Sequence, residues 1–337
     1  MSEMYDNDQR TSFFKKNDDL EVALTDLNNL ISTVNCEVEF SQPERPVVLL
    51  MGCPRAGSTL MLQWLASLGV FSYPSNLIAR FYKNPFIGIR AQQSLLELDP
   101  LNQLGFKENT NNFTSELGKT QGALSPSEFW YFWREYFEFG DISRMDADQL
   151  KKVNRERFLN QIGAFEFLMG KPLAMKGMML YDHIPFLYSL NKNFVFVDLR
   201  RDLFFNAQSL IFAREQYFDD RKKWYSFKPQ EYNTLKDKGP TEQVAGQVYY
   251  IRNSIDNGLS QIPETNQLSI DYSEFCSNPK SLLLNIKSKF AQLGFNLDID
   301  KLDTSLFAPF ESKESNKLCQ DETTLLKDEL LRLQGHE

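Results

Sequence analysis

Residues 47–68 read VVLLMGCPRAGSTLMLQWLASL and decide the fold of this chain. The first five residues, 47–51, form a continuous apolar run, which is typical of a strand buried on both faces of a parallel sheet. Gly52 and Gly57 then interrupt the pattern, and leucines return at helical spacing from position 60 onward. A strand that enters a helix through such a turn points backbone N–H groups and the positive end of the helix at one spot. The stretch therefore predicts a site for phosphate or sulfate.

The residues inside the turn indicate which anion chemistry to expect. Gly52 and Gly57 have the spacing of the nucleotide-hydrolase loop G-x-x-x-x-G-K-[ST], in which lysine follows the second glycine. Here Ser58 occupies the position of that lysine, and the cation of the loop is Arg55. Arg55 and the hydroxyls of Ser58 and Thr59 can hold a phosphate without a metal ion. An ordinary glycine-containing turn is the alternative for this segment taken alone.

A second anion site is predicted in residues 194–212, FVFVDLRRDLFFNAQSLIF. A buried strand over 194–199 leads into a helix, and Arg201 and Ser209 lie eight residues apart across the junction. Ser209 falls about two turns into the helix, where its hydroxyl can share one anion with Arg201. The alternative for Arg201 is a surface ion pair with Asp202. Two such sites imply a ligand that carries two separated phosphate groups.

Together the two segments resemble the sulfotransferase family that uses 3′-phosphoadenosine-5′-phosphosulfate (PAPS). CPRAGST at 53–59 is similar to the 5′-phosphosulfate loop of the family, and the stretch from Arg201 to Ser209 is similar to its 3′-phosphate motif. SIDYSEFCSNPKSLL at 269–283 is similar to a strand–turn–helix segment near the C-terminal side of these enzymes. The resemblance covers about residues 46–320. It implies that the donor is bound by Arg55, Ala56, Gly57, Ser58, Thr59, Arg201 and Ser209.

The resemblance implies an enzyme that transfers a sulfuryl group in line from PAPS to a hydroxyl or amine, without a metal, and releases 3′-phosphoadenosine-5′-phosphate (PAP). A saccharide or another small molecule would fit as the acceptor. Family members commonly place an adenine-stacking tryptophan where this chain has Leu60, so Trp64, Trp224 or another aromatic residue are the alternatives, and no adenine contact is assigned. A nucleotide kinase or hydrolase and a non-catalytic nucleotide binder are the rival functions.

Sulfuryl transfer needs a base that accepts the proton of the acceptor hydroxyl. The chain has two histidines, and His336 is the penultimate residue, so His183 is the predicted base. The alternative for His183 is a structural neighbour of Asp182, with Asp182 capping a helix that begins near residue 184. Asp182 is also the reserve base, and an acid within 97–135 is a further possibility.

The other catalytic residues are expected from the family pattern and from the charge that develops during transfer. The resemblance implies a catalytic role for Lys176, which lies 25 residues before Arg201. The leaving 5′-phosphate gains negative charge, so Arg55 is expected to stabilise it. A late stretch over 312–317, SKESNK, resembles a loop that closes over the nucleotide phosphates in relatives, and as composition alone it reads as an exposed loop.

The wider pattern alternates strand and helix, with strands expected over 46–51, 172–176, 194–199 and 267–272. This predicts an α/β fold: a three-layer, doubly wound parallel sheet of the P-loop NTPase-like type with a large helical insert. We expect a flexible arm and short helix over 1–40, and one sulfotransferase domain over 41–337. The insert, 76–168, is expected to be mostly helical and to form a lid on the acceptor side.

Other stretches predict helices with simpler roles. Apolar spacing predicts a core helix over 244–262 and an amphipathic helix over 321–333. Eight aromatic residues crowd into 129–139, as core packing or as a wall of the acceptor pocket.

Composition limits the remaining possibilities. The chain has 337 residues, of which 42% are apolar, and a net charge of −8. The negative charge argues against a general nucleic-acid binder, so anions must be held by local clusters. The four cysteines show no CxxC spacing, which favours reduced thiols in a cytoplasmic protein. No signal peptide or membrane span is recognised in the sequence.

Overall fold

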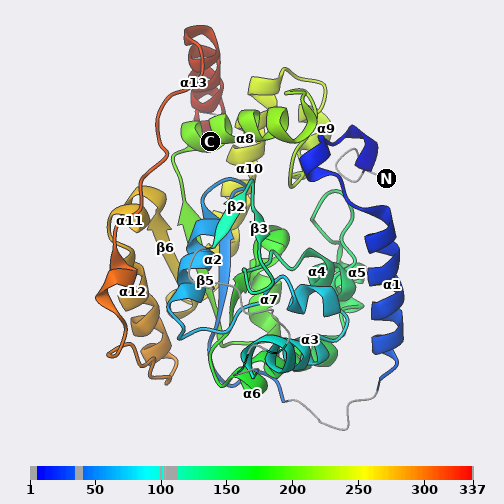
Figure 1. Ribbon diagram of the computed structural model, residues 1–337. Coiled ribbons are helices and arrows are strands. Elements are labelled where there is room, and N and C mark those ends of the chain that lie inside the picture. Colours follow the sequence, from blue (N-terminus) through cyan, green and yellow to red (C-terminus); the bar gives the residue numbers. More distant parts are fainter. Residues whose placement is uncertain (1–5, 35–40, 99–100, 102, 104–112, 336–337) are drawn as a thin grey trace.

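A parallel sheet of four strands forms the centre of the protein (Figure 1), with the strand order β4-β1-β5-β6. The computed structural model describes residues 6–34, 41–98, 101, 103 and 113–335. The strands are β1 (Val47–Gly52), β4 (Ala174–Lys176), β5 (Phe194–Arg200) and β6 (Gln267–Asp271). Each lies where the sequence predicts it. The predicted doubly wound α/β fold is confirmed.

The two faces of β1 pack into different cores because successive side chains of a strand point to opposite faces. Val48 and Leu50 join a cluster with apolar residues of α2 (Ser58–Ser67) and α12 (Pro279–Gln292). Leu49 and Met51 join a second cluster with residues of α4 (Trp130–Tyr136), α6 (Arg155–Met169) and α10 (Pro240–Ser260). Helices therefore cover both faces of the sheet, as a three-layer fold requires.

The register of the sheet brings several loops to one edge. Leu50 pairs with Lys176 at the end of β4, and Gly52 pairs with Leu199 near the end of β5. All four strands run in the same direction, so the segments that follow them begin at the same edge. Ligands of open α/β sheets bind beyond this carboxyl edge.

The remaining helices of the carboxyl half pack around the sheet (Figure 1). α8 (Leu203–Phe218) follows β5 and packs against α10, which also carries the C-terminal helix α13 (Gln320–Gln334). The smaller elements are η6 (Met178–His183), α7 (Ile184–Leu190), α9 (Tyr232–Leu235), η7 (Glu264–Asn266), α11 (Tyr272–Ser277) and η8 (Thr304–Phe307). The helices expected over 244–262 and 321–333 are thus present as α10 and α13.

The insert over 76–168 is mostly helical where it is described, but it also contains a hairpin. Its helices besides α4 and α6 are η4 (Ile78–Phe81), α3 (Pro85–Gln92), η5 (Gln93–Glu97) and α5 (Ala147–Lys151). β2 (Thr114–Glu116) and β3 (Lys119–Gln121) pair antiparallel through a turn in which Leu117 has φ 46° and Gly118 φ 88°. The sequence did not predict this hairpin because its strands lack apolar alternation.

The described part of the N-terminal segment is packed against the domain, which differs from the flexible arm expected over residues 1–17. η2 (Asn7–Gln9) and η3 (Ser12–Phe14) precede α1 (Asp18–Ser32), the helix expected near this position. Phe14 is 6% exposed, and the Thr11 N–H donates to the Tyr217 carbonyl at 3.0 Å. The buried Phe14 side chain fixes the position of this segment, although the polar composition of the segment does not predict an ordered structure. Residues 1–5 lie outside the described part.

None of the helices in the described part of the chain combines the length and the apolar character needed to cross a membrane.

Candidate active site

A large cavity of about 1650 Å³ lies at the carboxyl edge of the sheet. Its walls come from the loop after β1, from α8, from the N-terminal segment, from the β2–β3 hairpin and from the start of α4. Six of the predicted donor-binding residues line it: Arg55, Gly57, Ser58, Thr59, Arg201 and Ser209. The seventh, Ala56, is fully buried beneath the loop. The cavity therefore joins the two predicted anion motifs in one space.

The loop over 53–57 has the backbone geometry of an anion cradle. Gly57 has φ 107°, and a Cβ there would lie 2.7 Å from the Tyr272 ring. Arg55 also adopts the left-handed region, with φ 69°, and turns the chain toward the cavity. Gly57 is the N-cap of α2 and supplies no side-chain cap, so the first N–H groups of this helix are left for a ligand. These features fit a bound phosphate or phosphosulfate group.

The two predicted anion motifs are in direct contact. Arg201 donates through Nη1 to the Arg55 carbonyl at 2.9 Å, and Arg55 Nε donates to Ser209 Oγ at 3.4 Å. The alternative in which Arg201 pairs with Asp202 is wrong, since Asp202 Oδ1 caps α8 by accepting from the N–H groups of Phe204 and Phe205. The cationic and hydroxyl groups of both motifs thus form one continuous wall of the cavity.

The stretch over 312–317 lies against this wall. The carbonyl of Lys313 accepts from Arg201 Nη2 at 3.1 Å, and Glu314 Oε1 lies 3.4 Å from Arg201 Nε. Gln208 of α8 donates to the Ser315 carbonyl at 2.8 Å and holds the loop in place. Arg201, which the sequence predicts to bind a phosphate, is therefore paired with a carboxylate in this structure.

Lys176 lies behind the loop and joins two groups of the cavity wall. Its Nζ lies 2.6 Å from Glu128 Oε1 and donates to Thr59 Oγ1 at 2.8 Å. The Lys176 side chain is 2% exposed, and it does not line the cavity itself. Trp130 Nε1 donates to the other oxygen of Glu128 at 2.8 Å. Lys176 and Trp130 together fix a carboxylate at the cavity surface.

Glu128 lines the cavity, but the sequence did not single it out. It lies within the range 97–135, in which an unspecified acid was a further possibility for the base. Burial raises the pKa of Glu128, but the charge and hydrogen bond of Lys176, with help from Trp130 and Arg55, hold it below the usual value. The carboxyl is therefore ionised at neutral pH. An ionised, oriented carboxylate in a cavity has the properties of a general base.

His183 does not have the surroundings that its predicted role requires. It is 5% exposed, lies outside the cavity lining, and its Nε2 accepts from the Met145 N–H at 2.8 Å. Burial lowers the pKa of the imidazole. The nitrogen that would take a proton is thus already used inside the core, and this geometry does not support His183 as the base. His336 lies outside the described residues.

The surroundings of Asp182 also differ from those expected of a helix cap. The N-cap of α7 is His183, without a side-chain cap, so Asp182 does not cap this helix. Instead, its Oδ1 accepts a hydrogen bond from Ser254 Oγ of α10. Asp182 does not line this cavity.

Neither tryptophan considered for the purine reaches the cavity. Trp64 donates to the Leu306 carbonyl at 2.9 Å, and Trp224 donates to the Phe227 carbonyl at 3.2 Å; both are 3% exposed. The crowded aromatics over 129–139 divide into two groups: Trp133 is fully buried in the core, whereas Phe129, Trp130 and Tyr131 line the cavity.

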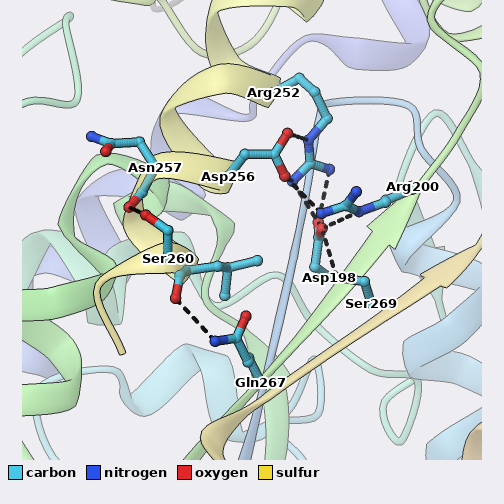
Figure 2. Close-up of polar contacts among 9 residues, drawn as sticks. Asp198, Arg200, Arg252, Asp256, Asn257, Ser260, Gln267 and Ser269 are labelled. Atoms are coloured by element: carbon cyan, nitrogen blue, oxygen red, sulfur yellow. Dashed lines mark hydrogen bonds and ion pairs between the residues drawn. The ribbon is translucent and has the colours of Figure 1, made fainter. Parts of the chain in front are cut away.

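A buried charge network holds the strand that leads to Arg201 (Figure 2). Arg252 of α10 donates to both oxygens of Asp198, at 2.9 and 2.8 Å, and Arg200 Nε lies 3.0 Å from the same carboxylate. Asp198 is fully buried, so these partners are needed to offset the loss of hydration. The network ties the end of β5 to α10. It positions Arg201 without entering the cavity.

Comparison with known proteins identifies the fold. No family profile matches the sequence, and no curated protein matches it either. Among solved structures, the sulfotransferase STF1 from Mycobacterium tuberculosis H37Rv is similar with a TM-score of 0.51 at 11% identity, covering 92% of this chain and 80% of that chain. The sulfotransferase STF9 from Mycobacterium avium has a TM-score of 0.47 at 13% identity, covering 98% of this chain and 80% of that chain. The chain has the sulfotransferase fold, and the predicted resemblance is confirmed at that level.

Proposed function

We propose that this protein is a sulfotransferase that transfers the sulfuryl group of PAPS to a hydroxyl or amine of a small molecule, saccharides included. The observation that carries the proposal is the meeting of three groups in one cavity. These are the cradle around Arg55, the pair Arg201 and Ser209, and the carboxylate of Glu128 held by Lys176.

The two anion motifs would share the donor between them. PAPS supplies a sulfuryl group on its 5′-phosphate. The N–H groups at the start of α2 and Arg55 would hold this phosphosulfate, while Arg201 and Ser209 would hold the 3′-phosphate. Lys313 and Lys317 also line this part of the cavity and add positive charge. No metal is needed in this arrangement, because the cations are supplied by side chains.

Glu128 would accept the proton of the acceptor hydroxyl. As the acceptor oxygen bonds to sulfur, the bond between sulfur and the 5′-phosphate oxygen breaks, and its electron pair leaves with PAP. Lys176 would keep Glu128 ionised and aimed, which makes it a positioning residue for the base. Arg55 and the loop N–H groups would stabilise the charge that develops on the leaving phosphate.

The proposed binding of the donor can be tested by calorimetry in the presence of EDTA, with PAP and adenosine 5′-phosphate as ligands. Arg201→Ala should weaken the binding of PAP by about 1.5–3 kcal/mol. The same change should weaken the binding of adenosine 5′-phosphate much less. Arg157→Ala is the matched control, because Arg157 forms an ion pair with Glu135 at 2.8 Å outside the cavity lining.

Three results would contradict the donor assignment: no binding of PAP, binding that EDTA abolishes, or an equal loss for both ligands in Arg201→Ala. A screen of hydroxyl and amine acceptors with radiolabelled PAPS then separates an enzyme from a non-catalytic binder. Binding of PAP with no transfer to any acceptor, and no release of sulfate, would favour the binder.

We also propose a reducing, cytoplasmic setting. The three cysteines among the described residues are free, and burial raises the pKa of the Cys53 thiol to about 12, which makes it unreactive.

A further inference from the structure

The cavity carries more positive charge than the proposed donor accounts for. Nine lysine and arginine side chains line it but only three glutamates, although the whole chain has a net charge of −8. Four of these cations belong to the donor motifs or to the loop beside them: Arg55, Arg201, Lys313 and Lys317. The other five come from the N-terminal segment and the insert: Arg10, Lys15, Lys16, Arg80 and Lys119. They lie on the acceptor half of the cavity.

Three of these five cations gather around Tyr131 and Tyr217, and we call Arg10, Lys16 and Arg80 the basic subsite. Lys16 Nζ lies 4.7 Å from the centroid of the Tyr131 ring and 2.7 Å from Glu21 Oε2. The Arg10 guanidinium lies 5.6 Å from the centroid of the Tyr217 ring. Elements far apart in the sequence thus build one positively charged corner.

The subsite has a surplus of charge. Glu21 pairs with Lys16 and accepts a hydrogen bond from the Tyr131 hydroxyl, so it neutralises one cation. Arg80 is exposed, and no carboxylate of the described residues forms an ion pair with it. Arg80 therefore adds a positive charge to the cavity wall that no ion pair within the described part of the chain offsets.

The subsite lies close to the carboxylate that we propose as the base. Burial raises the pKa of Tyr217, the charges of Arg10 and Lys16 lower it, and the charge of Glu128 raises it. Trp130 donates through Nε1 to Glu128 at 2.8 Å, and the next residue, Tyr131, carries the ring that Lys16 contacts. Glu128 is also only three residues from Tyr131. A small molecule can reach from one to the other.

We propose that the acceptor is an organic anion: its hydroxyl or amine meets Glu128 while a carboxylate, phosphate or sulfonate group binds the basic subsite. Apolar surface between them would hold the body of the molecule, since Phe14, Trp130 and Phe227 also line the cavity. This inference rests on the proposed function, because it takes Glu128 as the reacting end of the acceptor.

The inference can be tested with two dyes that share one apolar body. 1-Anilinonaphthalene-8-sulfonate carries a sulfonate, and N-phenyl-1-naphthylamine is the same molecule without it. Fluorescence titrations are made on the full chain saturated with PAP, so that the donor half is filled. We expect the sulfonated dye to bind at least about 10-fold more tightly than the neutral one.

Variants locate the site of this preference. Arg80→Gln should reduce the affinity for the sulfonated dye by about 3- to 10-fold and leave the neutral dye and PAP unchanged. Because Arg80 is exposed, this variant is expected to fold, and its unfolding temperature checks that. Lys151→Gln is the control: the Lys151 side chain is 75% exposed on α5, outside the cavity lining.

Equal affinities for the two dyes in the wild-type protein, or a preference that is undiminished in Arg80→Gln, would overturn the inference. A loss of PAP affinity in Arg80→Gln would also overturn it, because the cations would then belong to the donor. The proposed function fails separately, if calorimetry shows that PAP does not bind. In that case the Arg80→Gln comparison, made on the ligand-free protein, still decides whether the subsite binds anions.

Discussion

Glu128 combines the three properties that a base in this cavity needs. It lines the cavity, it is ionised because Lys176 outweighs its burial, and Lys176 and Trp130 fix its two oxygens. Sequence spacing could not reveal this, because Glu128 and Lys176 are 48 residues apart and meet only through the fold. The donor residues, by contrast, lie in compact motifs, where each strand leads directly into a helix. The sequence alone was therefore sufficient to predict that these residues lie together at one edge of the sheet.

We predict that Glu128→Gln lowers the turnover number by about 10²–10⁴-fold and leaves PAP affinity nearly unchanged. The amide keeps the shape of the side chain but cannot take a proton. Steady-state kinetics and calorimetry on the same preparation measure the two effects. Glu135→Gln is a matched control, because Glu135 lies on the neighbouring helix α4 and pairs with Arg157 outside the cavity lining. Near-normal turnover in Glu128→Gln, with a large loss in His183→Ala, would restore His183 as the base.

Lys176 should control the pH dependence of the reaction. The base works in its ionised form, and Lys176 lowers the pKa of Glu128, so the wild-type rate should hold until the pH falls below the usual carboxyl range. Lys176→Met removes this charge and leaves burial, which raises the pKa. The acid limb of the rate profile should therefore move to higher pH in the variant. An acid limb at the same pH in both proteins would show that Lys176 does not act on the base.

Among the elements of the cavity wall, the stretch over 312–317 makes a contact that its sequence did not predict: Glu314 pairs with Arg201. Glu314 takes the place beside Arg201 that a phosphate would need, and two like charges cannot share it. We predict that Glu314→Gln tightens PAP binding by about 3- to 10-fold, because the ligand no longer competes with a carboxylate. Adenosine 5′-phosphate, which lacks the 3′-phosphate, should bind equally well to both proteins.

Calorimetry with the two nucleotides measures this difference, and Glu322→Gln is the control. Glu322 pairs with Arg221 at 2.7 Å and does not line the cavity. Weaker PAP binding in Glu314→Gln would mean that the carboxylate supports Arg201 and does not compete with the ligand.

Elements were predictable to different degrees for a physical reason. β1, β5, α10 and α13 carry strong apolar patterns, so the sequence identified them with nearly the right bounds. The β2–β3 hairpin is polar and depends on the two left-handed residues of its turn, which no hydrophobic pattern signals. The N-terminal segment is also polar, and it is held by the burial of Phe14 and by contacts to residues distant in sequence, such as Tyr217 and Lys119.

At the scale of the whole molecule, the donor half and the acceptor half of the cavity have different origins. The donor half follows from the parallel sheet, whose strands end at one edge and present their loops to one ligand. The acceptor half is assembled from the N-terminal segment, the hairpin and α4, which are distant in sequence. This is why the sequence could predict the fold and the candidate donor residues, whereas the proposed base and acceptor wall became visible only in the structure.

A crystal structure of the protein with PAP is the most direct test of the proposed donor site and of its position relative to Glu128. We predict the 5′-phosphate on the loop over 53–59 and the 3′-phosphate at Arg201 and Ser209, with Glu314 moved away. The open side of the 5′-phosphate should face Glu128 across a space that fits one acceptor group. PAP bound elsewhere would contradict the proposed donor site. PAP bound with its 5′-phosphate turned away from Glu128 would contradict the assignment of Glu128 as the base.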